Sequence, residues 1–132
     1  MAEAHPQIER PLSPHLMAYG WPLTMMSSIL HRVTGMALYF GTLLLVWWLV
    51  AAATSSAYFE FVNWIFGSWF GQLVLLGYTW ALFQHMAGGL RHFIWDFGLG
   101  FGPVEREVLT YGSFVFSGGL TFLVWAIGYL LR

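Results

Sequence analysis

One uncharged stretch decides the fold: Val33-Thr-Gly-Met-Ala-Leu-Tyr-Phe-Gly-Thr-Leu-Leu-Leu-Val-Trp-Trp-Leu-Val-Ala-Ala-Ala-Thr-Ser-Ser-Ala-Tyr-Phe59. Two further uncharged stretches follow it, at residues 61–84 and 108–131. Each of them is longer than the roughly 20 residues that a helix needs to cross a bilayer. The sequence therefore predicts an all-α membrane protein with three transmembrane helices, which span about residues 28–53, 63–92 and 108–130.

The composition supports a membrane protein and excludes several other classes. Hydrophobic residues make up 58% of the 132-residue chain and charged residues only 8%, whereas about 25% of a soluble domain is charged. The few basic residues provide no clustered basic face for nucleic acid. Because cysteine is absent, this chain cannot carry a disulfide, a cysteine-ligated iron–sulfur cluster or a c-type haem attachment. Any iron–sulfur centre that works with it is expected in another subunit.

The arginines predict how the chain is oriented in the membrane. Four of the five basic residues fall on one side of the predicted spans: Arg10, Arg32, Arg91 and Arg106. The positive-inside bias places that side, with the N-terminus, in the cytoplasm. Residues 1–21 are then expected to form a cytoplasmic arm interrupted by prolines, and residues 22–132 a three-helix anchor domain. The arm lacks the apolar segment of a signal peptide, and the expected location is a bacterial inner membrane.

The first group of candidate functional residues lies at the cytoplasmic end of the first span, in Ser28-Ile-Leu-His31-Arg32-Val-Thr-Gly35. Ser28, His31 and Arg32 share a helix face, because their spacing is i, i+3 and i+4. The planar guanidinium of Arg32 suits a carboxylate such as a haem propionate, and the hydroxyl of Ser28 can donate to a quinone carbonyl. The same residues also fit an ordinary anchor at the lipid headgroups, so the spacing alone leaves both interpretations open.

The second group lies in His85-Met-Ala-Gly-Gly89-Leu-Arg91-His92-Phe-Ile-Trp-Asp96. His85 is predicted to lie roughly 10 Å deeper than His92, in the hydrocarbon, where an ionisable side chain by default marks a functional site. Imidazole is a common ligand of haem iron, and Gly89, one turn later, would let a flat macrocycle lie against the helix. A polar hydrogen bond between two helices is the competing interpretation of His85.

Together, the two groups resemble the signatures of a known family. The segment Arg10-Pro-Leu-Ser-Pro-His-Leu16, with Ser28–Gly35, resembles one signature of the cytochrome b556 subunit of succinate dehydrogenase, and His85–Asp96 resembles the other. The resemblance covers residues 10 to about 102, in the same order and spacing. It implies that the chain is the larger membrane anchor of complex II, and that its three helices form half of a heterodimeric helical anchor.

The resemblance also implies which residues serve the cofactor and the substrate. His85 resembles the axial ligand of haem iron that this subunit contributes. Four residues resemble cofactor-binding positions: His31, Arg32, Gly89 and His92. Three resemble quinone-binding positions: Ser28, Ile29 and Arg32. Two others match the motif in a supporting role: Arg91 and Asp96.

The cofactor implied in this way is one haem b, shared with a second small anchor subunit that supplies the other axial ligand, and the substrate is ubiquinone. The implied partners are that anchor subunit, an iron–sulfur subunit, a flavoprotein subunit that oxidises succinate, and the lipid bilayer. Two alternatives stay open. One is a fumarate reductase-type anchor that works in the reverse direction. The other is a structural membrane anchor without a cofactor, which a haem absorbance spectrum would distinguish.

Overall fold

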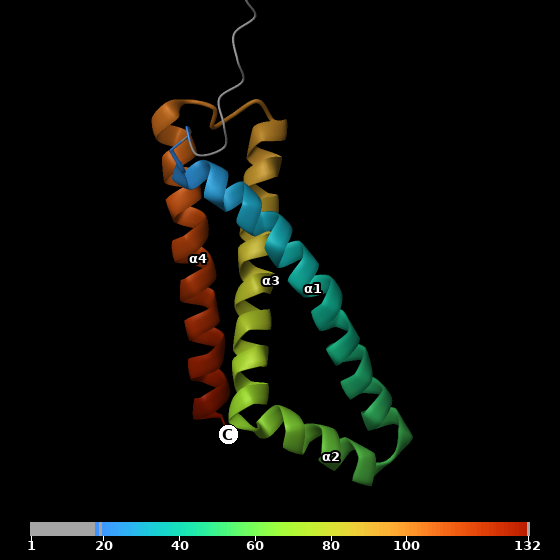
Figure 1. Cartoon of the computed structure of the whole chain (residues 1–132). Coiled ribbons are helices and arrows are strands. Elements are labelled where there is room, and N and C mark those ends of the chain that lie inside the picture. Colours follow the sequence, from blue (N-terminus) through green and yellow to red (C-terminus); the bar gives the residue numbers. More distant parts are fainter. Residues whose placement is uncertain (1–17, 19, 132) are drawn as a thin grey trace, which may run out of the picture.

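The computed structural model describes Ala18 and residues 20–131, so most of the predicted N-terminal arm, including Arg10, lies outside the described residues. Within them the chain forms four helices and no strand. These are α1 (Leu23–Thr54), α2 (Ser56–Gly67), α3 (Trp69–Asp96) and α4 (Pro103–Leu130), as Figure 1 shows. The predicted all-α class is confirmed.

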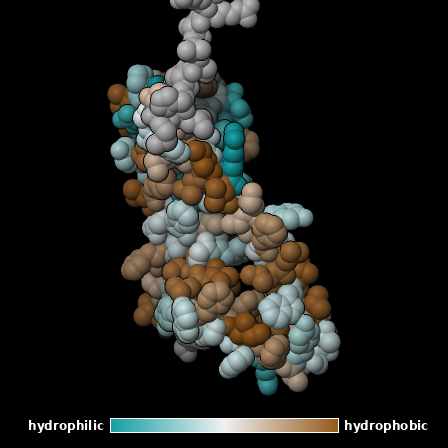
Figure 2. Space-filling view, in the orientation of Figure 1, coloured by the Kyte–Doolittle hydropathy of each residue, from teal (hydrophilic) through white to brown (hydrophobic). Residues whose placement is uncertain are grey.

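The helices are those of a membrane protein in length and composition. Both α1 and α4 are long and apolar enough to cross a bilayer, and α2 with α3 passes the same test as one bent pair. Large apolar side chains cover much of the outer surface (Figure 2). The buried positions instead include many small polar side chains, which pack and hydrogen-bond between helices as is common inside membranes: Ser27, Thr34, Thr110, Ser113, Ser117 and Thr121.

The sequence predicted one continuous helix over residues 63–92, and this expectation is wrong. The chain breaks at Ser68, and the axes of α2 and α3 differ by 80°. The Ser68 hydroxyl accepts from the backbone N–H of Gly71 at 3.1 Å and donates to the carbonyl of Ile65 at 2.6 Å, so it caps both helix ends. A side chain at Gly71 would overlap the backbone of Ile65 and Phe66. The corner therefore requires glycine at position 71. The stretch around Ser68 contains no charged residue that would indicate a break in the helix.

α1 meets α3 and α4 at one end of the molecule and diverges from them toward the other. α3 and α4 lie side by side, while α1 crosses α3 near the His85–His92 segment and then diverges until α2 bridges the gap (Figure 1). A buried hydrogen bond joins α3 to α4, because Ser117 donates to the Gln84 side chain at 2.6 Å. The crossing of α1 and α3 brings the two predicted groups of residues together.

Candidate functional site

Three histidines gather where α1 crosses α3. The imidazole rings of His31 and His85 stack with their centroids 4.0 Å apart and their planes 8° apart. The His92 ring lies 5.4 Å from that of His31. Within the described residues, no three His, Cys, Asp or Glu side chains are arranged to hold a metal ion by themselves. The cluster therefore provides imidazoles from two helices beside one another.

Two glycines allow this close crossing. A Cβ on Gly88 would overlap the Nδ1 atom of His31, and a Cβ on Gly35 would lie 2.9 Å from the Cε1 atom of His85. Each histidine thus packs against a glycine of the other helix, in the way that small residues permit close helix approach in membranes. Gly88 was not among the predicted site residues. The only signal for it in the sequence is the Gly88-Gly89 pair.

Replacing Gly88 by alanine is expected to loosen the crossing. The added methyl group meets the His31 ring, and overpacking of this kind costs about 1–3 kcal/mol. The midpoint of unfolding of the detergent-solubilised protein should fall accordingly. Gly77→Ala is the matched control on the same helix, because its Cβ would have no neighbour within 4 Å. Equal midpoints for the two variants would contradict this account of the crossing.

Hydrogen bonds to His85 determine which of its ring nitrogens is free. Its Nδ1 atom lies 3.1 Å from the carbonyl oxygen of His31 and 3.4 Å from the hydroxyl of Thr34. In the neutral tautomer that donates from Nδ1 to this carbonyl, Nε2 keeps its lone pair. Nε2 has no hydrogen-bond partner among the described residues. This is the arrangement in which a histidine ligates a metal through one nitrogen while the other is held by the protein.

Open surface at Gly89 and an unpartnered ring nitrogen of His31 lie near His85. A Cβ on Gly89 would meet no atom within 4 Å, so the chain leaves the surface beside Gly89 free. The Nδ1 atom of His31 is buried and has no hydrogen-bond partner among the described residues. His92 and Asp96, further along α3, are exposed. Thr34, which the sequence analysis missed, is buried and lies one turn after His31 on the same helix.

The residues predicted to contact a quinone lie on the surface of α1. Ser28, Ile29 and Arg32 are all exposed, and within the described residues the side chains of Ser28 and Arg32 make no hydrogen bond. They lie beside His31 in the chain. The Ser28 hydroxyl and the Arg32 guanidinium are therefore free to bind a group from outside this chain.

Arg91 occupies a different position from the one predicted. The sequence analysis counted Arg91 among the arginines on one side of the spans, where arginine ordinarily lies at the membrane interface, but Arg91 is only 4% exposed. Its Nη1 atom donates to the hydroxyls of Ser27 at 2.7 Å and Thr110 at 3.1 Å. The guanidinium also lies over the Trp95 ring, 5.1 Å from its centroid. Arg91 therefore links α3 to both α1 and α4.

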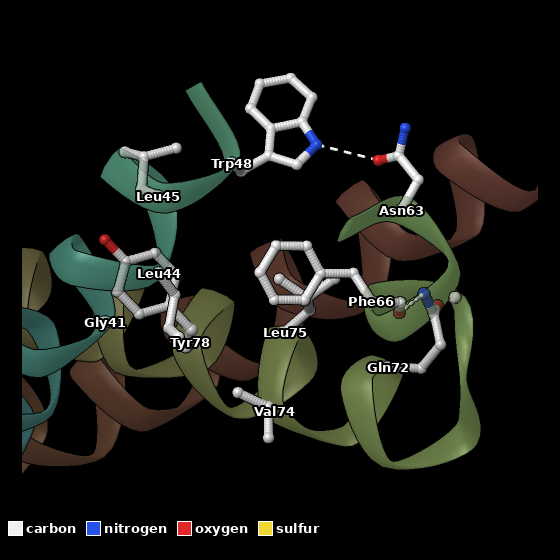
Figure 3. Close-up of a pocket in the computed structure, with 11 residues that line it drawn as sticks. Gly41, Leu44, Leu45, Trp48, Asn63, Phe66, Gln72, Val74, Leu75 and Tyr78 are labelled. Carbon is white, nitrogen blue, oxygen red and sulfur yellow. Dashed lines mark hydrogen bonds between the residues drawn. The ribbon is translucent and has the colours of Figure 1, made fainter. Parts of the chain in front are cut away.

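A separate cavity of about 420 Å³ lies at the far end, among α1, α2 and α3 (Figure 3). Its walls are mostly apolar, and Trp48 donates to the Asn63 side chain at 2.9 Å across one edge. The Gln72 amide donates to the carbonyl of Phe66 at 2.8 Å on another. None of the predicted site residues lines this cavity. The cavity depends on the corner at Ser68, which the sequence did not indicate.

Comparison with known proteins identifies the family. Residues 6–128 match the model of the family described as succinate dehydrogenase/fumarate reductase transmembrane subunit. The chain belongs to this family. The match includes both groups of residues that carried the resemblance, and it spans all four helices almost completely.

Several relatives in this family have established names. The succinate dehydrogenase cytochrome b556 subunit of Paracoccus denitrificans is 50% identical over 91 residues, which cover 69% of this chain and 70% of the relative. The subunit of the same name from Rickettsia felis is 36% identical over 117 residues, or 89% and 91% of the two chains. The mitochondrial succinate dehydrogenase cytochrome b560 subunit of Bos taurus is 37% identical over 95 residues, or 70% and 56%.

Proposed function

We propose that this chain is the membrane anchor and cytochrome b subunit of a succinate dehydrogenase, in which it binds haem b and contributes to the site of ubiquinone reduction. Family membership supports the anchor role, and the relatives' names support a cytochrome. The observation that carries the proposal within this chain is His85. Its Nδ1 atom is held by the carbonyl of His31 at 3.1 Å, which leaves Nε2 for iron.

The residues around His85 fit a haem. The uncovered surface at Gly89 provides room for a flat macrocycle against α3. The exposed His92 is a suitable donor to propionates, and Arg32 can provide a charged fork for the same groups. His31, whose Nδ1 atom is buried against Gly88, would support the site through its carbonyl and its ring, which hold His85. A bound haem supplies one-electron chemistry. This chain would hold its iron from one side, and we propose that a second small anchor subunit holds it from the other.

Ser28, Ile29 and Arg32 provide what a quinone site needs on the α1 side. The Ser28 hydroxyl can donate to a quinone carbonyl oxygen, and the Arg32 guanidinium can stabilise negative charge as it develops on that oxygen. Ile29, which is 44% exposed, offers an apolar wall. Two electrons from an iron–sulfur subunit and two protons convert the quinone to a quinol. In the succinate dehydrogenase that we propose, oxidation of succinate belongs to a flavoprotein subunit.

The space at Gly89 gives a specific test of the haem site. Gly89→Leu is expected to lower the haem content of the purified complex severalfold, because the new side chain would occupy the surface that we assign to the macrocycle. The helix packing of this chain should persist, since a Cβ there meets no atom within 4 Å. Haem per complex is measured by the pyridine haemochrome. Gly77→Leu is the control, and normal haem content in Gly89→Leu would refute the assignment.

The proposed topology places the N-terminus and the α3–α4 loop in the cytoplasm of a bacterium, with the chain in the inner membrane. Arg32, Arg91 and Arg106 lie toward that side, in agreement with the positive-inside bias. A reporter fused after Arg132 that is active only in the periplasm should therefore be active. Activity of a cytoplasm-specific reporter at the same position would contradict this orientation.

Two alternatives differ from the proposal, one in the direction of the reaction and one in the cofactor. The family description also names fumarate reductase, but the relatives reported above are named for succinate dehydrogenase. A cofactor-free anchor is the other alternative. A pyridine haemochrome spectrum of the purified complex, with a subunit gel, tests the proposal against it. We expect b-type haem to copurify with this chain, and the absence of haem from an intact complex would support the structural anchor.

A further inference from the structure

Arg91 is a buried charge that the proposed function leaves without a task. Of the charged residues that the structure describes, it alone is buried, with 4% of its surface exposed. Its hydrogen bonds go to the neutral hydroxyls of Ser27 and Thr110. Within residues 20–131, no carboxylate forms an ion pair with it, and its Nε atom is buried without a partner. Among the described residues, its contacts therefore leave the positive charge unneutralised.

A group from outside the chain is poorly placed to neutralise this charge. The first turns of α1 lie across α3 and α4 at the end where Arg91 is buried (Figure 1). The Trp95 ring covers the guanidinium as well, 5.1 Å from its centroid. Because these contacts leave only 4% of the Arg91 surface exposed, a subunit or lipid headgroup that docks on the chain has little access to the guanidinium. The charge is thus fixed in place by the fold.

The charge lies close to the position that we assign to iron. Arg91 follows His85 by six residues on the same continuous helix, which separates the two residues by about 9 Å along the axis and by about 120° around it, so that the guanidinium and the iron would lie roughly 12 Å or more apart. In a protein interior the effective dielectric is far below that of water, so a charge acts strongly over such a distance. Reduction of a ferric haem adds one electron and lowers the positive charge at the iron. A nearby cation therefore favours the reduced form.

We propose that Arg91 is a fixed cation that raises the reduction potential of the haem held at His85. The inference rests on the proposed haem site. Arg91 does not ligate iron in this account; it acts through its electric field, and Ser27 and Thr110 hold it in position. At an effective dielectric of about 20, its loss should shift the equilibrium toward ferric haem by roughly tenfold, which corresponds to about 59 mV for one electron.

Four variants of the purified complex test this role by redox titration of the haem absorbance band. Arg91→Gln removes the charge but keeps donors for the two hydroxyls. Arg91→Lys keeps the charge with a different geometry. Ser27→Ala removes one hydrogen bond and leaves the cation in place. Ser27→Asp keeps a hydrogen-bond acceptor for Arg91 and adds a carboxylate that neutralises its charge. This variant therefore tests the effect of the charge separately from the effect of the hydrogen bond.

The expected result is a lower potential in Arg91→Gln and Ser27→Asp, and a potential near that of the unaltered complex in Arg91→Lys and Ser27→Ala. If Arg91→Gln fails to assemble, the comparison of Ser27→Asp with Ser27→Ala decides. An unchanged potential in the charge-removing variants, or an equal fall in Ser27→Ala, would overturn the inference. Absence of haem from the unaltered complex would instead refute the proposed function, so the two failures are distinguishable.

Discussion

Replacing His85 by leucine is expected to abolish haem binding in the purified complex while the chain still inserts. Loss of an outer-shell partner alone typically weakens metal binding by about 10–100-fold, and loss of the ligand itself should exceed that. The variant also loses the hydrogen bond from His85 to the His31 carbonyl, which is 3.1 Å long. The measurement is the Soret band and the pyridine haemochrome per unit of complex, with subunit content checked on a gel.

His92→Leu is the matched control for this experiment. His92 lies on the same helix and belongs to the same cluster, with its ring 5.4 Å from that of His31, but it is exposed. It should retain most of the haem, because we assign it to the periphery of the site and not to iron. Full haem content in His85→Leu, or an equal loss in the two variants, would mean that His85 is not the ligand.

Replacing Arg32 by leucine is expected to slow ubiquinone reduction by roughly tenfold or more. A hydrogen bond from a charged donor contributes about 1.5–3 kcal/mol, and each 1.36 kcal/mol expressed in the transition state corresponds to tenfold in rate. Ser28→Ala should act in the same direction with a smaller effect, since a neutral hydroxyl is the weaker donor. Both side chains are exposed and make no hydrogen bond within the described residues, so neither change should disturb the helix.

Oxidation of succinate with an artificial dye provides the internal control for these two variants. It should persist at the normal rate, because that chemistry belongs to other subunits in our proposal. Arg106→Leu, which removes another exposed arginine of the chain, should leave ubiquinone reduction unchanged. Normal ubiquinone kinetics in both Arg32→Leu and Ser28→Ala, in an intact complex, would exclude the quinone role.

The histidine cluster shows how much of the candidate site could be predicted from the sequence. Helical spacing placed His85 deep in its span and His31 near the end of another, and the crossing of α1 and α3 brings their rings to 4.0 Å. The residue types and their periodicity were sufficient to single out the two histidines, but not to predict that their rings stack. The spacing could not reveal that Gly88 makes the contact possible, because the partner surface is known only once the two helices have been brought together.

The corner at Ser68 and the burial of Arg91 show what the sequence could not reveal. Serine and glycine are tolerated within membrane helices, so nothing in the uncharged stretch around Ser68 distinguishes a bend from a straight span. Arginine near a span end ordinarily indicates the interface, yet Arg91 is enclosed because Ser27 and Thr110 approach it from two other helices. Both features depend on contacts between segments distant in the chain.

The most direct test of the central claim is a cryo-electron microscopy structure of the complex purified with this chain. We expect density for one haem beside α3, with its iron bonded to the Nε2 atom of His85 and its second axial ligand from another subunit. A haem whose iron lies away from His85, or the absence of a haem from this site in the intact complex, would contradict the account.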